Sequence, residues 1–63
     1  MKVYIEKENK YLDVNASKGT QLLELLKINP STVLIVKNNE VVLEDEQLDN
    51  NDEIKILSVI SGG

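Results

Sequence analysis

The chain has 63 residues and a formal net charge of −4, and it contains no cysteine, histidine or arginine. A chain of this length forms one domain, and without cysteine or histidine it has no disulfide, no thiolate metal site and no Ser-His or Cys-His catalytic pair. The acidic balance and the missing arginine argue against direct nucleic-acid binding, and the lack of a signal peptide or a long apolar run predicts a cytoplasmic protein with no membrane association.

The first expected element in chain order is a β-hairpin. Val3 and Ile5 alternate with residues that can face solvent, and so do Leu12 and Val14. This period-2 alternation is typical of strands with one buried face. The polar segment 7–10 between the two runs predicts the turn of the hairpin.

A helix is expected next, over Gln21–Lys27. Thr20 is a suitable N-cap for it, and Asn29-Pro30 is expected to end it, because the residue before a proline is pushed out of the helical region. The apolar positions have helical spacing, which leaves the polar positions for solvent. These apolar positions are Leu22, Leu23, Leu25 and Leu26.

The next segment predicts two strands and an irregular loop. The continuous aliphatic run 33–36 is typical of a strand that is covered on both faces. Asn38-Asn39 tolerates positive φ and predicts a tight turn into a short return strand at Val41-Val42. The acidic segment 43–52 is irregular, with Leu48 as a single apolar plug and a second turn at residues 50–52.

The last strand contains Ile54 and Ile56 and continues to Ile60. The order strand, strand, helix, strand, short strand, strand predicts an α+β fold. Since right-handed crossovers dominate, one solution places the first and last strands side by side and parallel in a mixed sheet, with one helix packed across one face. This is the ubiquitin-like β-grasp arrangement, with a β-grasp domain at residues 1–60 and a flexible C-terminal Gly-Gly tail at residues 61–63.

The Gly-Gly tail is the strongest functional signal in the chain. Gly62 and Gly63 have no Cβ, so the tail can lie extended in a narrow channel with backbone close on both sides. The terminal carboxylate is ionised near neutrality, and in that form it is a poor electrophile. It becomes reactive only if a second protein activates it.

A second candidate site is the sheet face that points away from the helix. If the regularly spaced Val and Ile side chains of the first and last strands face the helix, alternation turns Tyr4, Leu57 and Val59 the other way. One of Leu34 or Val36 is expected to join them. Such an exposed apolar patch beside the tail predicts a protein-docking surface, although a small domain can also expose apolar residues for lack of polar cover.

A metal site is not expected. Asp49, Asn51 and Glu53 alternate like calcium ligands, but the loop lacks the glycine and the bidentate glutamate that a calcium loop requires.

Three segments resemble the ThiS/MoaD sulfur-carrier family. Asn51-Asp52-Glu53-Ile54-x-Ile56, followed by Val59-Ile60-Ser61-Gly62-Gly63, is similar to the family's Gly-Asp-Glu-(Ile/Val) run, strand and Gly-Gly ending. The segment 38–42 resembles its Asn-Gly-Glu-Val-Val turn, and the segment 20–26 resembles its Thr-Val-x-Glu-Leu-Leu helix start. Asn39 and Asn51 replace family glycines, and asparagine reaches left-handed conformations better than most residues.

The resemblance implies a sulfur carrier that is not itself an enzyme and binds no cofactor. In such a carrier an activating enzyme uses ATP to adenylate the carboxylate of Gly63, which then becomes a thiocarboxylate. A sulfur-accepting synthase or thiolase takes the sulfur in a thiamin, molybdopterin or tRNA thiolation pathway. The residues expected to contact these partners are Ser61, Gly62, Tyr4, Leu57 and Val59, and we expect the chain alone to be a monomer.

Two other functions fit the same residues. A ubiquitin-like modifier would be joined through Gly63 to lysines of target proteins and needs the same adenylate. A plain interaction module would have an incidental tail. Among carriers, the short chain favours the thiamin branch, whereas Ser61 before Gly62 resembles the molybdopterin ending.

Overall fold

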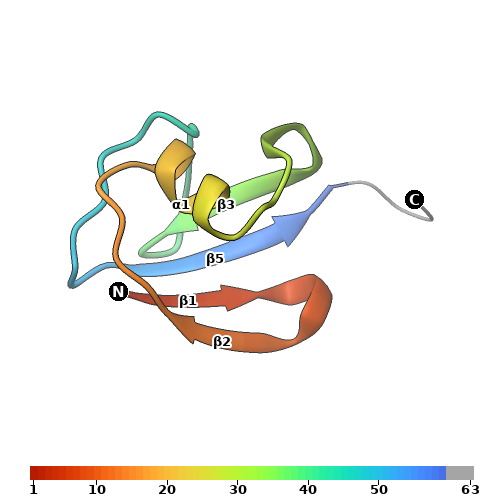
Figure 1. Cartoon of the computed structure of the whole chain (residues 1–63), viewed down its shortest axis with the longest axis horizontal. Coiled ribbons are helices and arrows are strands. Elements are labelled where there is room, and N and C mark those ends of the chain that lie inside the picture. Colours follow the sequence, from red (N-terminus) through yellow and green to blue (C-terminus); the bar gives the residue numbers. More distant parts are fainter. Residues whose placement is uncertain (60–63) are drawn as a thin grey trace.

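The computed structural model describes residues 1–59, which form a five-stranded mixed sheet with an α-helix across one face (Figure 1). The strand order is β2-β1-β5-β3-β4. The elements are β1 (Lys2–Ile5), the 3-10 helix η1 (Glu6–Glu8), β2 (Lys10–Asp13), α1 (Gly19–Leu25), the 3-10 helix η2 (Pro30–Thr32), β3 (Val33–Lys37), β4 (Glu40–Val42) and β5 (Glu53–Ser58).

The predicted β-grasp arrangement is confirmed at the centre of the sheet. β1 and β5 pair in parallel, with Val3 opposite Ile54 and Ile5 opposite Ile56. β1 also pairs with β2 in antiparallel orientation, and β3 pairs in antiparallel orientation with both β5 and β4. The opening hairpin and the return strand are therefore where the sequence pattern placed them.

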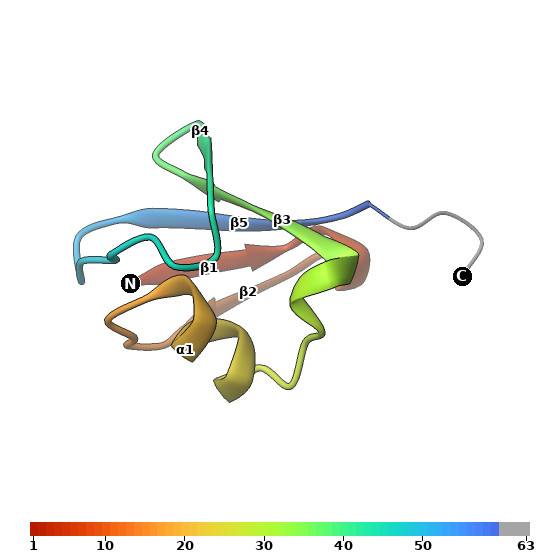
Figure 2. The same cartoon turned by 90° about the horizontal axis from the view of Figure 1, so that it is seen from above.

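The core lies between the sheet and α1, which Figure 2 shows on one side of the sheet. Alternate side chains of the central strands point to the face that α1 covers. There they pack against two leucines of the helix. The buried members of this cluster are Met1, Val3, Ile5, Leu22, Leu23, Ile35, Ile54 and Ile56. Leu48, the predicted plug, is half-buried against the cluster.

The helix begins earlier than predicted and is not capped by Thr20. Its N-cap is Lys18, whose side chain makes no capping hydrogen bond. The first-turn amide of Gly19 instead donates to the Glu46 carbonyl at 3.1 Å, and the Gln21 side chain reaches back to accept from the Ser17 amide at 2.7 Å. The loop therefore satisfies the first amide of the helix, and no side-chain cap is formed.

The helix also ends before the predicted Asn29-Pro30 stop. Lys27 has a φ of 58°, and its amide donates to the Glu24 carbonyl at 3.1 Å while the Ile28 amide donates to the Leu23 carbonyl at 2.9 Å. These two bonds form a Schellman motif. Leu25 is the last residue of the helix and is 57% exposed, so it does not share the buried face that Leu22 and Leu23 form.

Gly19 is required where the helix meets the acidic loop. A Cβ at this position would lie 2.5 Å from the Glu44 carbonyl oxygen and 2.8 Å from Cδ1 of Ile35. The same loop is held further along its length, where the Leu48 amide donates to the Ser17 carbonyl at 2.8 Å. Residues 43–52 are thus irregular, as predicted, but fixed against the start of α1.

The two asparagine turns differ from each other. Asn38 and Asn39 have φ of 50° and 72°, which confirms the tight turn between β3 and β4 and is typical of a two-residue hairpin loop. Asn51 does not have positive φ, so its expected left-handed conformation is wrong. The turn before β5 is instead closed by the Asp52 amide, which donates to the Asp49 carbonyl at 3.0 Å.

Within the part of the chain that the structure describes, no helix has the length and apolar character needed to cross a membrane.

Candidate functional site on the open face of the sheet

The candidate site is the sheet face opposite α1, which we call the open face. Strand pairing aligns five of its residues in one line across all five strands, because paired residues point to the same side. Tyr4 pairs with Tyr11 of β2 and with Lys55 of β5, Lys55 pairs with Val36 of β3, and Val36 pairs with Val41 of β4. We call this line Tyr11-Tyr4-Lys55-Val36-Val41 the central row.

A second apolar pair lies on the open face nearer the end of β5. Leu57 pairs with Leu34 of β3, so Leu57 and Tyr4 share the face, as predicted. Val36 lies on the same side of β3 but is buried, so of the two residues it is Leu34 that joins the exposed patch, as predicted. Val59 follows the end of β5, is 50% exposed, and donates from its amide to the Thr32 carbonyl at 2.9 Å.

The prediction that residues 33–36 form a strand covered on both faces is wrong. Leu34 is 42% exposed, whereas Ile35 is buried against the helix. A continuous apolar run does not distinguish a strand that is buried on both faces from a strand that has one buried face and one exposed apolar face. Tyr11 and Val41 at the two ends of the central row are also exposed, at 68% and 64%, whereas Val36 between Lys55 and Val41 is buried. Apolar side chains are therefore exposed at both edges of the sheet as well as at Leu34.

The tyrosine end of the central row has a fixed geometry. The rings of Tyr4 and Tyr11 have centroids 4.7 Å apart and are tilted by 44°. The Tyr4 hydroxyl donates to Oδ1 of Asn9 at 2.7 Å, and Asn9 itself has a φ of 50° in the hairpin turn. The hairpin turn therefore orients Tyr4, and Tyr4 contributes an apolar ring with its polar end already bonded.

Charged side chains lie on the open face at the end of the sheet away from the Leu57–Leu34 pair. Lys2 of β1 pairs with Asp13 of β2 and with Glu53 of β5, so a cation stands between two anions. Lys55 in the central row has only uncharged neighbours across both of its strand pairs. Sequence reasoning missed Lys55, although its alternation with Leu57 already placed it on this face.

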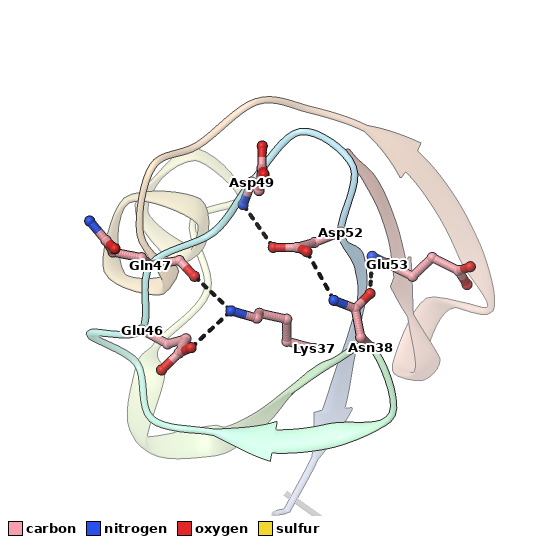
Figure 3. Close-up of polar contacts among 7 residues, drawn as sticks. All are labelled: Lys37, Asn38, Glu46, Gln47, Asp49, Asp52 and Glu53. Carbon is pink, nitrogen blue, oxygen red and sulfur yellow. Dashed lines mark hydrogen bonds and ion pairs between the residues drawn. The ribbon is translucent and has the colours of Figure 1, made fainter.

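A polar network fixes the loop that leads into β5 (Figure 3). Nζ of Lys37 donates to Oε2 of Glu46 at 2.8 Å and to the Gln47 carbonyl at 3.1 Å. The bond to Glu46 raises the pKa of the Lys37 ammonium above its ordinary value. This pair ties the end of β3 to the acidic loop.

The second half of the network centres on Asp52. Its Oδ1 accepts from Nδ2 of Asn38 at 2.9 Å and its Oδ2 accepts from the Asp49 amide at 2.7 Å. These hydrogen bonds, the one from Asn38 above all, lower the pKa of the Asp52 carboxyl. The network lies at the start of β5, so it positions the strand that carries Lys55 and Leu57.

The predicted reactive end, Ser61, Gly62 and Gly63, lies outside the described residues, and so does Ile60. The proposed boundary between a domain at 1–60 and a tail at 61–63 falls in the same segment. The described chain reaches Val59, beside the Leu57–Leu34 pair. Of the predicted partner-binding residues, Tyr4, Leu57 and Val59 can therefore be placed, and Tyr4 and Leu57 lie on one face.

The chain is similar to a known protein family and to two known proteins over most of its length. A model of the ThiS family matches residues 3–63. The chain is 42% identical over 52 residues to an uncharacterized protein of Archaeoglobus fulgidus, and this alignment covers 82% of the chain and 76% of that protein. It is 33% identical over 57 residues to the sulfur carrier protein TtuB of Thermus thermophilus, which covers 89% of this chain and 88% of TtuB.

The match and the fold agree on the family. The family match extends through both terminal glycines, and the mixed sheet with parallel central strands and a helix across one face is a ubiquitin-like β-grasp. Sulfur carriers of this type are small carrier proteins and not enzymes themselves. The chain therefore belongs to the ThiS family, the ThiS/MoaD type of sulfur carrier.

Proposed function

We propose that this protein carries sulfur as a thiocarboxylate on Gly63. The observation that carries the proposal is the family match through residue 63, which includes the Gly-Gly end. The relative TtuB, named a sulfur carrier protein, supports the same role. The carrier supplies the reacting carboxylate, and a partner enzyme supplies the catalytic groups and ATP.

The proposed chemistry has two steps. The Gly63 carboxylate oxygen attacks the α-phosphorus of ATP on the activating enzyme, a P–O bond forms, and pyrophosphate leaves. The resulting acyl-adenylate has a good leaving group on the carbonyl carbon. Sulfide, or the terminal sulfur of a persulfide, then attacks that carbon and displaces AMP; reduction by a thiol releases the thiocarboxylate where a persulfide was used.

The glycine end suits this chemistry for a steric reason. The carbonyl carbon passes through a tetrahedral intermediate in the second step, and glycine leaves it uncrowded because it has no Cβ. Gly62 also has no Cβ, and Ser61 has a small side chain. We propose that these three residues enter a narrow channel of the activating enzyme.

The open face is the proposed docking surface for that enzyme. Tyr4 on β1, Leu57 on β5 and Val59 just after β5 contribute apolar surface. Exposed Leu34 on β3 enlarges this surface. An apolar surface of this kind gains free energy when a partner covers it. Because β5 is held in the sheet on both sides, docking there fixes the direction in which β5 meets the partner.

The acceptor of the sulfur is a finer question. We propose the thiamin branch first, while Ser61 before Gly62 resembles the molybdopterin ending, and tRNA thiolation is the third pathway proposed for a carrier of this type. Reconstitution with each candidate synthase identifies the acceptor, because only the cognate synthase consumes the thiocarboxylate.

Intact-mass analysis tests the proposed function. The protein is incubated with ATP, sulfide and the activating enzyme encoded in the same genome. We expect the mass increase that replaces one oxygen by sulfur, and no increase for a variant that lacks Gly63 or ends in an amide. Larger conjugates without the sulfur shift would indicate a protein modifier, and an unchanged mass with ATP consumption no higher than background would contradict both functions.

A further inference from the structure

Lys55 is a cation in the middle of an otherwise uncharged row. Its neighbours in the central row are Tyr4 on β1 and Val36 on β3, and the row ends in Tyr11 and Val41. We propose that Lys55 selects the docking partner, which presents an acidic side chain surrounded by apolar surface. This inference rests on the proposed function, because it concerns the partner that docks on the open face.

Lys55 is free to make such a contact. Its side chain is exposed, and within residues 1–59 it forms no ion pair and no side-chain hydrogen bond. The other lysine of the open face, Lys2, stands between Asp13 and Glu53 across the strands. Lys37 is held by Glu46 at 2.8 Å. Glu53 is the nearest carboxylate on the same face of β5, but it pairs across the strands with Lys2, and no ion pair joins it to Lys55 among residues 1–59. Lys55 is therefore the open-face cation that has no oppositely charged residue opposite it in either neighbouring strand.

The position of Lys55 makes docking unfavourable for a partner that offers its ammonium group no opposite charge. A partner that covers Tyr4, Leu57 and Leu34 also covers the strand position between them, so it removes water from around Lys55. Taking a charge out of water is unfavourable unless an opposite charge pairs with it. A purely apolar partner would leave the ammonium unpaired, whereas a carboxylate at this place would pair with it inside the contact.

The charge of the rest of the chain makes this requirement specific. The net charge is −4, and the acidic loop 43–52 lies between β4 and β5 and contributes no residue to the central row. Long-range attraction therefore favours a partner whose docking region is basic at its edge. Lys55 requires an acidic group at the centre of the partner's docking surface. The net charge of the carrier and the charge of Lys55 together therefore define a partner surface with a basic rim, an apolar patch inside it and an acidic side chain in the middle.

The test is steady-state pyrophosphate release by the activating enzyme of the same organism, measured against carrier concentration. The variants are Lys55→Glu, which reverses the charge, and Lys55→Met, which removes it and keeps an unbranched apolar side chain. Lys18→Glu is the matched control, because Lys18 precedes α1, which covers the opposite face. Circular dichroism melts establish that all variants are folded.

We expect Lys55→Glu to lower kcat/KM by about tenfold or more, Lys55→Met to lie between it and the wild type, and Lys18→Glu to stay within about twofold of the wild type. A Lys55→Met carrier that is adenylated more efficiently than the wild type would overturn the inference, because it would mean that the partner is apolar at this place. Equal losses for Lys55→Glu and Lys18→Glu would also overturn it. Normal wild-type adenylation with unaffected variants rejects only the role of Lys55, whereas a wild type that is not adenylated at all rejects the proposed function and this inference together.

Discussion

Asn38 and Asp52 are 14 positions apart and are joined by a hydrogen bond of 2.9 Å from Nδ2 to Oδ1. The other side-chain atom of Asn38, Oδ1, accepts from the Glu53 amide at 3.0 Å. One asparagine in the β3–β4 turn therefore binds the two residues at which β5 begins. This contact sets where β5 enters the sheet, and with it the position of Lys55 and Leu57 on the open face.

The first prediction concerns acid sensitivity. The hydrogen bond from Asn38 holds the pKa of Asp52 below its ordinary value of 3.8. Since the folded-state pKa is the lower one, the ionised Asp52 contributes stability above pH 3.8, and this contribution is lost as the pH falls through the folded-state pKa. We expect urea denaturation to show a weaker dependence on pH in this acidic range for Asp52→Asn than for the wild type.

Asp45→Asn is the matched control for that experiment. Asp45 is exposed in the same loop and forms no side-chain hydrogen bond or ion pair among residues 1–59. If Asp45→Asn weakened the pH dependence as much as Asp52→Asn does, net charge and not the Asn38 contact would be its cause.

The second prediction concerns Gly19. Alanine has the higher helix propensity, but the added Cβ would meet the Glu44 carbonyl oxygen at 2.5 Å. That oxygen belongs to backbone and cannot rotate away, so we expect Gly19→Ala to lower the free energy of unfolding by about 1–3 kcal/mol. Chemical denaturation measures it. A stability gain would show that the loop moves freely away from the helix.

The third prediction compares the contributions of two leucines of the helix, one buried and one exposed, to the free energy of unfolding. Leu22 is fully buried and Leu25 is 57% exposed. We expect Leu22→Ala to cost about 2–5 kcal/mol, because it leaves a cavity in the core, and Leu25→Ala to cost less than about 0.5 kcal/mol. Equal costs in a denaturation experiment would mean that the Leu25 side chain is buried in solution as Leu22 is.

The fourth prediction concerns docking. Leu57 is half-buried on the open face opposite Leu34, so Leu57→Asp places a charge in the apolar patch. We expect it to lower the free energy of unfolding by about 1–2 kcal/mol and to abolish adenylation of Gly63 under conditions in which the variant is folded. Normal adenylation kinetics would refute the patch.

Leu25→Asp provides the comparison for Leu57→Asp. It introduces the same charge at an exposed leucine of α1, which packs on the other face of the sheet. Adenylation of this variant is expected to match that of the wild type. A loss as large as that of Leu57→Asp would mean that any added negative charge impairs docking.

The periodicity of the sequence was informative wherever a segment has one buried face. Val3, Ile5, Ile54 and Ile56 were assigned to the core from alternation, and all four are buried there. The same alternation placed Tyr4 and Leu57 on the opposite face, since side chains of a strand point to the two sides in turn. Asn38-Asn39 predicted the β3–β4 turn because few other residues tolerate positive φ.

Prediction from the sequence was less successful wherever a partner segment distant in sequence decides the outcome. Thr20 has the chemistry of a cap, but the Glu46 carbonyl binds the first amide of the helix. Leu25 has helical spacing, but α1 turns Leu22 and Leu23 toward the sheet and leaves Leu25 exposed. The first outcome depends on how residues 43–52 fold back and the second on how α1 lies against the sheet, and no local pattern encodes either.

The sequence by itself determined the strand and helix types and the aliphatic core, because these follow from local spacing and residue type. Only the tertiary structure decided that Lys55 stands between Tyr4 and Val36, and that one row of paired residues runs from Tyr11 to Val41 across the sheet. The reason is physical: neighbours across a sheet are set by strand register, and register here depends on contacts such as that between Asn38 and Asp52, which join residues far apart in the chain.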